Sequence, residues 1–202
     1  MNENNIYEEQ DMQEENIGEI SRKKKIILNL YEWVEEFTIA IAVIVILLSF
    51  AVRVVTVSGT SMLPTYRHND RLIITSYNNE INVGDVVVLV DVLDEPIIKR
   101  VIATEGQTVD IDTEKGIVYV NGEALDDSVY GIENGITFLE SAAVFHTKFP
   151  CTVPEGHIFV LGDNRRVSND SRYSAIGMVD ERKVLGKAFF SIFPFDKIGF
   201  TK

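Results

Sequence analysis

The chain has 202 residues, 46% of them hydrophobic and 25% charged, an ordinary composition for one or at most two globular domains. Its 31 acidic residues outnumber 19 basic ones, and the formal net charge of −12 argues against a general nucleic-acid-binding protein. A single cysteine, Cys151, excludes an intrachain disulfide framework and a multi-cysteine zinc site. Three scattered histidines disfavour a His-based metal centre, so we expect neither a metal nor a cofactor.

The N-terminal segment, residues 1–21, is acidic and poor in apolar side chains. Its first 20 residues contain seven Asp or Glu and no Lys or Arg. Such a segment cannot bury enough apolar surface to offset the entropy lost on ordering. We expect a disordered tail.

A basic flank at residues 22–25 precedes an uncharged, almost wholly apolar run from Phe37 to Val52. As a helix, this run would span about 24 Å, slightly less than a hydrocarbon core of about 30 Å. Arg53 can snorkel outward and further apolar residues follow it, which extends the run. We therefore expect one transmembrane helix within residues 22–57, a lipid bilayer as partner, and a cytoplasmic N-terminus by the positive-inside rule.

Two other interpretations of the apolar run remain. A buried core helix is one, but a core helix in a small domain is rarely apolar on all sides. A cleaved signal peptide is the other, because a basic stretch precedes the apolar one. Against it, the run begins late, is long, and lacks an A-x-A-like end.

The remainder, residues 58–202, has the pattern of a mainly β domain on the outer side of the membrane. Short runs rich in β-branched and aromatic residues alternate with turn residues, and they predict strands near 71–77, 85–92, 97–104, 108–112, 116–122, 157–163 and 183–193. Asn121-Gly122 predicts a tight hairpin turn. We expect an antiparallel β barrel or sandwich-like domain, with residues 126–150 as an insertion or a long loop.

The C-terminal stretch contains five phenylalanines between residues 189 and 200. These side chains could belong to the core, or they could let the domain rest on a membrane surface. We expect them to belong to the core.

Two segments contain residues suited to nucleophilic catalysis. Ser61 is flanked by small residues and followed by Pro64, so a constrained turn could hold its hydroxyl exposed, although the composition is also that of a linker. Lys99 lies in an apolar strand pattern that puts Ile97 on its own face. A buried lysine whose pKa falls from about 10.4 to about 7–8 can act as a general base, and an ordinary solvated lysine is the alternative.

A third segment, residues 162–173, is polar and directly follows a predicted strand. Asp170 and Arg172 could form an ion pair, and Ser168 could hydrogen-bond a neutral lysine amine. The alternative is a solvated turn rich in Asx hydrogen bonds.

These segments together resemble the type I (leader) signal peptidases of serine peptidase family S26, in the bacterial Ser–Lys branch. The stretches SGTSMLPT, IIKRVIA, GDNRRVSNDSR and VLGKAFFSIFPFDKIGF resemble the family's boxes, in the family's order and behind an apolar run. The resemblance implies Ser61 as nucleophile, Lys99 as general base and Ser168 as the residue that orients the lysine. Asp163, Asp170 and Arg172 match the family's structural polar residues.

The sequence departs from the family at two places. After IIKRVIA the family usually has a Gly-Leu-Pro-Gly-Asp-like turn, where Thr104-Glu105-Gly106 stands here. Some members place a serine hydroxyl in the oxyanion hole two residues before the nucleophile, and Gly59 occupies that position. Only a backbone N–H, that of Ser61, carries over as an oxyanion donor.

The implied activity is membrane-bound cleavage of N-terminal signal peptides from secreted preproteins after small residues, of the Ala-x-Ala type. The partners are preproteins and the bilayer, with no nucleic acid. We expect Met62 and Ile97 to line the small apolar pockets. Two other classes remain open: a tethered binding domain without catalysis, and an autoproteolytic Ser–Lys regulator, which would need a DNA-binding domain that the acidic N-terminus does not offer.

Overall fold

The computed structural model describes residues 24–25, 27–46, 52–76, 80–139 and 146–201. The chain divides into two compact units, Met1–Phe50 and Ala51–Lys202. The acidic tail expected at residues 1–21 lies outside the described residues.

The first unit contains a helix over residues 27–46 with exposed side chains. Its first half carries Glu32, Glu35 and Glu36, and its apolar half, 37–46, leads into residues 47–51, which lie outside the described residues. Within the described part of the chain, no helix is both long and apolar enough to span a membrane.

The predicted end of the apolar helix is a strand instead. Residues assigned to it form β1 (Val52–Thr56), which pairs antiparallel with β2 (Arg71–Thr75). The physical reason is the run of β-branched residues on either side of Arg53, which suits a pleated strand and finds a partner in β2. The helix-to-domain boundary therefore lies before Val52, not near residue 57.

The second unit is mainly β and antiparallel, as predicted. Its larger sheet has the order β1-β2-β11-β3-β4-β9-β10, and β12 pairs with β11. The further strands are β3 (Val86–Leu89), β4 (Ile97–Thr104), β9 (His157–Leu161), β10 (Val179–Asp180), β11 (Val184–Phe193) and β12 (Gly199–Phe200). The predicted strand at 97–104 is present with the same bounds, and those at 71–77, 85–92, 157–163 and 183–193 are present with shorter bounds.

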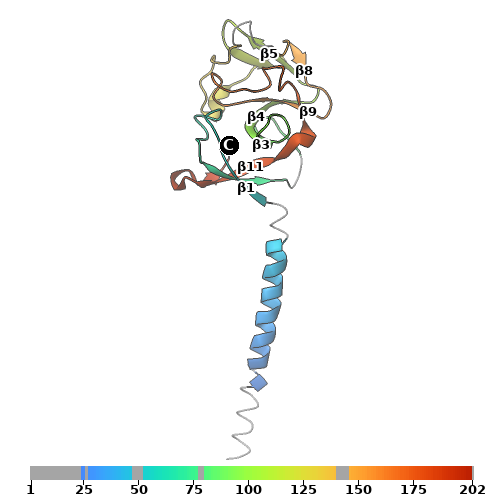
Figure 1. Cartoon of the computed structure of the whole chain (residues 1–202), viewed down its shortest axis with the longest axis vertical. Helices are drawn as coiled ribbons and strands as arrows, with labels where there is room; N and C mark the ends of the chain where they lie inside the picture. The colour runs from blue at the N-terminus through green and yellow to red at the C-terminus, as the bar shows by residue number, and fades with distance from the viewer. Residues whose placement is uncertain (1–23, 26, 47–51, 77–79, 140–145, 202) are drawn as a thin grey trace, which may run out of the picture. The chain divides into compact units, whose positions relative to one another are not determined.

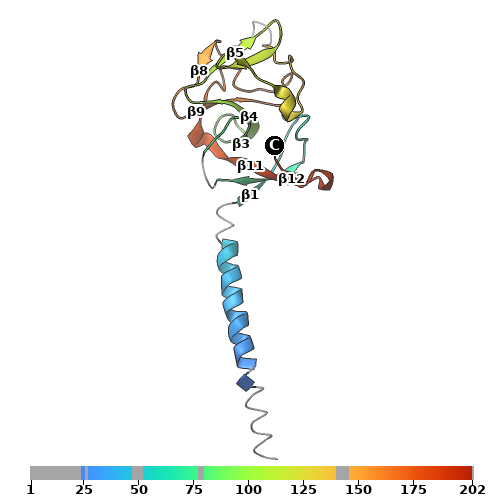
Figure 2. The ribbon, with the colours of Figure 1, turned by 180° about the vertical axis from the view of Figure 1, so that it is seen from behind.

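A smaller four-stranded sheet has the order β7-β6-β5-β8. Its strands are β5 (Thr108–Asp112), β6 (Ile117–Val120), β7 (Glu123–Ala124) and β8 (Cys151–Thr152). The predicted hairpin joins β6 to β7, and both Asn121 (φ 52°) and Gly122 (φ 82°) have the left-handed backbone that such a turn needs. This sheet and β1 lie at opposite ends of the domain (Figures 1 and 2).

Three clusters of buried aliphatic and aromatic side chains form the core of the domain. The C-terminal phenylalanines do not all join them. Phe195 and Phe200 are 79% and 81% exposed, and Phe193 is 41% exposed, so the prediction that this stretch is core is wrong for these three. They lie at the end of β11, in the short 3-10 helix η3 (Phe195–Lys197) and on β12, where no further layer covers them within the described residues.

The irregular segment predicted at 126–150 contains the 3-10 helix η1 (Asp127–Tyr130). Residues 140–145 lie outside the described residues. Asp126 caps η1 by accepting from the Ser128 amide, and Gly131 ends it with a left-handed backbone.

Candidate active site

Ser61 and Lys99, 38 positions apart in the chain, lie within hydrogen-bonding distance of each other. Ser61 sits in the turn after β1, and Lys99 is in the middle of β4. Lys99 Nζ donates to Ser61 Oγ at 3.0 Å and to the Ile98 carbonyl at 3.0 Å. The arrangement brings a hydroxyl into direct contact with an amine that could accept its proton.

The Lys99 amine lies in a desolvated place, because only 3% of the residue is exposed. Burial lowers its pKa below the ordinary lysine value, and nearby Arg172 acts in the same direction. Asp170 and Asp163 oppose this shift through their negative charge, but burial is the largest influence. The environment therefore makes the Lys99 amine easier to deprotonate than an ordinary solvated lysine.

The turn that holds Ser61 is fixed by contacts on both sides. The Asn164 amide donates to the Ser61 carbonyl at 2.9 Å, and Asn164 Nδ2 donates to the Thr60 carbonyl at 3.1 Å. On the other side, the Gly59 amide donates to His68 Nδ1 at 3.2 Å, which Gly59 permits through its positive φ of 82°. Neither Asn164 nor His68 stood out in the sequence.

Ser168 is buried beside this turn, but it does not contact Lys99 by a hydrogen bond. Its hydroxyl is without a hydrogen-bond partner within the described residues. Gly162 separates it from the nucleophile turn, since a β-carbon on Gly162 would lie 2.6 Å from the Ser61 carbonyl oxygen and closer still to the Ser168 hydroxyl. Only glycine fits between them.

Three buried Arg–Asp pairs involve the site loop, which we define as residues 162–172. Arg172 pairs with Asp170 at 2.8 Å, as the sequence suggested. Two further pairs were not foreseen: Arg100 Nε and Nη2 donate to Asp163 at 2.9 and 2.8 Å, and both Arg165 Nη atoms donate to Asp127 at 2.7 Å. Removing one partner of such a pair typically costs about 3–5 kcal/mol, because the other charge stays buried and unpaired.

The two residues expected to line an apolar pocket occupy different places. Met62 is 1% exposed and packs in the core with Val57 and Tyr66. Ile97 packs against the cluster that contains Val87, on the opposite face of β4 from its neighbour Ile98.

An apolar groove does lie near Ser61, and Ile98 rather than Ile97 is part of it. The groove has a volume of about 340 Å³ and is lined by Val55, Thr56, Ser58, Val88, Glu95, Pro96, Ile98 and Leu185. Alternation along β4 puts Ile98 on the face opposite to Ile97 and to the apolar core around Val87. The sequence alone does not tell which of the two faces borders a groove.

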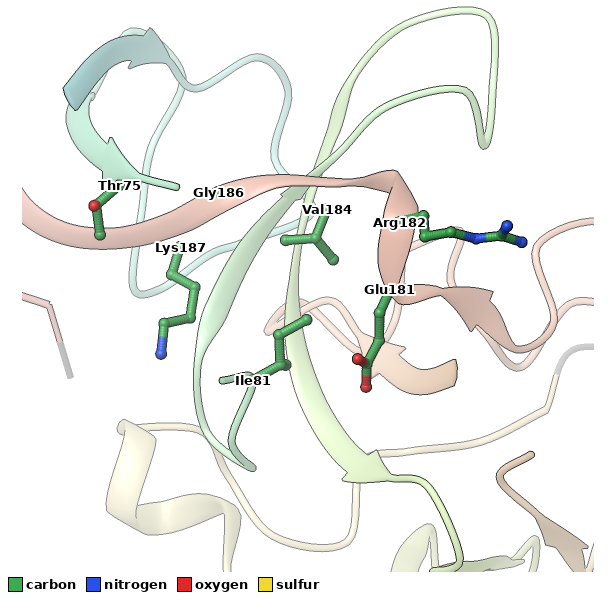
Figure 3. Close-up of a pocket in the computed structure, with 7 residues that line it drawn as sticks. All are labelled: Thr75, Ile81, Glu181, Arg182, Val184, Gly186 and Lys187. Carbon is green, nitrogen blue, oxygen red and sulfur yellow. The ribbon is translucent and has the colours of Figure 1, made fainter. Parts of the chain in front are cut away.

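A second pocket contains none of the predicted site residues. Figure 3 shows Lys187 and Glu181 at its wall, with Thr75, Ile81, Arg182, Val184 and Gly186. Lys187 is already engaged there, since its Nζ lies 3.0 Å from an Asp85 carboxylate oxygen and donates to the Glu80 carbonyl at 2.7 Å. Within the part of the chain that the structure describes, no three His, Cys, Asp or Glu side chains are grouped to hold a metal ion.

Residues 30–193 match the protein family described as signal peptidase, peptidase S26. The chain is 34% identical over 175 residues to signal peptidase I of Bacillus licheniformis, which covers 84% of this chain and 92% of that protein. It is 31% identical over 183 residues to signal peptidase IB of Staphylococcus aureus, covering 85% and 94%. A solved structure of a signal peptidase I from Enterococcus faecalis aligns with a TM-score of 0.42 at 29% identity, over 54% of this chain and 96% of that one.

The family match includes Ser61, Lys99 and the whole site loop, and it extends from the described helix to the end of β11. The relatives are matched over most of their own length as well as most of this chain. The chain therefore belongs to the signal peptidase family of S26 serine peptidases.

Proposed function

We propose that this chain is a membrane-bound endopeptidase that cleaves N-terminal signal peptides from secreted preproteins, with Ser61 as nucleophile and Lys99 as general base. The observation that carries the proposal is the 3.0 Å contact between Lys99 Nζ and Ser61 Oγ at a lysine that is almost completely buried. A serine needs an adjacent base to become a nucleophile, and a desolvated lysine supplies one.

The reaction follows from this contact. Neutral Lys99 takes the Ser61 hydroxyl proton as Oγ attacks the scissile carbonyl carbon, forming a tetrahedral intermediate. The resulting ammonium returns the proton to the leaving amine, the peptide bond breaks, and an acyl-enzyme ester remains on Ser61. Lys99 then takes a proton from water as the water oxygen attacks the ester carbon, and the ammonium gives that proton to Ser61 Oγ as the ester bond breaks. The carboxylic acid product leaves and ionises, and Ser61 and neutral Lys99 are restored.

The backbone N–H of Ser61 is the oxyanion donor in this proposal. It makes no hydrogen bond within the described residues, so it is free to stabilise the negative charge that develops on the carbonyl oxygen. The Gly59 amide is occupied by His68, which supports Ser61 rather than Gly59 as the donor.

The substrate has an open strand edge to bind. β4 pairs with β3 over Ile97–Arg100, but its pairing with β9 begins only at Arg100. Within the described residues, positions 97–99 of β4 therefore pair with a strand on one side only. Their other edge lies next to the groove that contains Ile98 and Ser58. An extended cleavage segment can add there through main-chain hydrogen bonds. We propose that this groove selects small side chains, with Met62 in the core cluster against which Val55, Ile98 and Leu185 pack.

The membrane-bound part of the proposal rests on two features. The apolar run from Phe37 to Val52 is uncharged, and its residues 47–51 lie outside the described residues. Exposed Phe193 also lies near β1, because Phe193 pairs with Arg71, and Arg71 pairs with Thr56, two strand spacings or about 10 Å away. Exposed Phe195 packs against Phe193 with ring centroids 5.7 Å apart, and exposed Phe200 lies on β12 beside β11. We propose a single span with a cytoplasmic N-terminus and the β domain outside, resting these aromatics on the bilayer surface.

The test is cleavage of a purified preprotein by the full chain in lipid, comparing wild type with Ser61→Ala and Lys99→Ala. We expect both variants to fold and to lose cleavage, by about 10³-fold or more. Normal cleavage by either variant would move the chemistry to other residues. Absence of cleavage by wild type, across several preproteins, would favour a tethered binding domain.

A further inference from the structure

The two buried arginines of the site loop both reach the same neighbouring stretch, residues 126–138, which we call the clamp segment. Arg165 donates through both Nη atoms to the Asp127 carboxylate at 2.7 Å, and through Nη1 to Thr137 Oγ1 at 2.8 Å. All three residues are buried, at 2%, 3% and 0% exposure. Arg172 adds a second attachment, since its Nη1 donates to the Phe138 carbonyl at 2.9 Å.

The clamp segment is held in shape by contacts of its own. The Asp127 amide donates to Asn134 Oδ1 at 2.8 Å, and the Thr137 amide donates to the Gly116 carbonyl at 2.9 Å. Gly116 lies so close that a β-carbon there would be 2.7 Å from the Gly135 carbonyl oxygen. The carboxylate that faces Arg165 is therefore presented from a surface fixed independently of the site loop.

A short chain of contacts connects Asp127 to the reacting atoms. Arg165 Nε donates to the Gly162 carbonyl at 3.1 Å, and Gly162 packs against both the Ser61 carbonyl and the Ser168 side chain. The loop has other attachments as well, since Asp163 accepts from Arg100 and the Gly162 amide donates to Asp170 Oδ2 at 3.1 Å, and Arg165 is the residue whose side chain donates to the Gly162 carbonyl. The Gly162 carbonyl is thus held by Arg165, whose own position is set by Asp127 and Thr137.

We propose that Asp127 is a positioning residue for catalysis, which holds Gly162 and Ser168 against Ser61 and Lys99 through its bidentate pair with Arg165. This inference rests on the proposed function of Ser61 and Lys99. It assigns a role to the clamp segment, whose composition indicated only an insertion or a long loop.

Loss of this support has a specific consequence at Lys99. When Gly162 and Ser168 move away, water reaches the Lys99 amine, which at present is buried. The charged groups that face this amine are Asp163, Asp170 and Arg172, and they remain in place with their own partners. Hydration then stabilises the ammonium, so the acid limb of the pH–rate profile moves to higher pH. The groove at Val55, Val88 and Ile98 is built from other elements, so substrate binding is largely kept.

The experiment measures kcat, KM and the pH profile of preprotein cleavage by the full chain in lipid. The variants are Asp127→Asn, with Glu133→Gln as the matched exposed carboxylate on the same segment, and Arg165→Lys, with Arg166→Lys as its exposed neighbour. We expect Asp127→Asn and Arg165→Lys to lower kcat about 10- to 100-fold, with KM within about 2-fold and the acid limb at higher pH. Asp127→Glu should recover part of kcat, and both controls should match wild type.

Thermal unfolding measures separately whether each variant is folded. If Asp127→Asn does not fold, Arg165→Lys, which keeps the positive charge, tests the inference in its place. A folded variant with wild-type kcat and an unmoved pH profile would overturn the inference, as would losses that simply follow the unfolded fraction. Failure of the proposed function has another signature: cleavage by Ser61→Ala, or none by wild type. If Ser61→Ala and Lys99→Ala lose cleavage but Asp127→Asn keeps full activity, the role of Asp127 is refuted and the proposed function is not.

Discussion

Lys99 combines a catalytic advantage with a cost in stability. Its pKa in the folded protein lies below the value in the unfolded chain because burial penalises the charged amine. Below the folded-state pKa, burying the protonated amine therefore destabilises the fold, and this effect disappears above the unfolded-state value of about 10.4.

Replacing Lys99 with Met tests this trade-off. We expect Lys99→Met to abolish cleavage and to raise the melting temperature at neutral pH, by about 2–4 °C for each kcal/mol recovered. The increase should shrink as the pH approaches 10. Thermal unfolding as a function of pH measures it, and an equal or lower melting temperature at every pH would contradict the burial argument.

Gly162 provides a second test at the same scale. A methyl group there meets the Ser61 carbonyl and the Ser168 side chain, so the nucleophile must shift. We expect Gly162→Ala to lower kcat by about 100-fold, because small displacements of reacting groups have effects of that size. Gly199→Ala, at a glycine with open space around it and no left-handed backbone, is the control and should keep full activity. Wild-type kcat in Gly162→Ala would show that the turn can relax.

The sequence predicts some contacts of the site but not others. The Asp170–Arg172 pair is local, so its residues stand side by side in one motif. Arg100 and Asp163 are 63 positions apart, and Arg165 and Asp127 are 38 apart. Alternation in a strand predicts that Arg100 must point to one face, but it cannot predict which carboxylate meets it there.

At the scale of elements, β4 serves three purposes at once. It carries Lys99, whose amine reaches Ser61, it places Ile98 in the groove on one face, and it packs Ile97 and Val101 into the core on the other face, which by alternation is also the face of Lys99. Among the described residues, its pairing with β9 covers Arg100 to Thr104, so residues 97–99 keep a free edge on that side, where we propose that the substrate binds.

The groove makes a prediction about selectivity. Ile98→Ala should raise kcat/KM for a preprotein with Leu in place of Ala three residues before the bond, relative to the Ala form, by about 10-fold. Ile97→Ala is the matched control, because it removes the same atoms on the other face. Competition assays with both preproteins give the ratio, and an equal change in both variants would mean that the groove does not contact that position.

The strands with clear alternation or β-branched runs were predictable, and β1 shows where such patterns fail. Residues 52–56 continue the apolar character of the run before them, so composition alone could not separate helix from strand. Residues 52–56 form a strand because β2 lies beside them as a pairing partner. Likewise, a cluster of phenylalanines indicates burial in some apolar environment, but it does not say whether that environment is the core.

At the scale of the whole molecule, the exposed aromatics of the β domain allow a test of the proposed contact with a bilayer. We predict that a Phe195→Ser, Phe200→Ser double variant of the full chain cleaves a short soluble peptide in detergent at the wild-type rate. Its cleavage of a preprotein embedded in vesicles should fall several-fold, because the two side chains are 79% and 81% exposed and are available to lipid. Equal activity in vesicles would assign these side chains no role at the membrane.

The pH dependence of kcat/KM for preprotein cleavage tests the central claim most directly. Histidine is the rival base near neutral pH, and the chain has three, His68, His146 and His157. With Lys99 as base, we predict one acid limb, with an apparent pKa below the ordinary lysine value of about 10.4, which stays in place when each histidine in turn is replaced by Gln. Disappearance of the limb in one of these variants would contradict the Ser61–Lys99 mechanism.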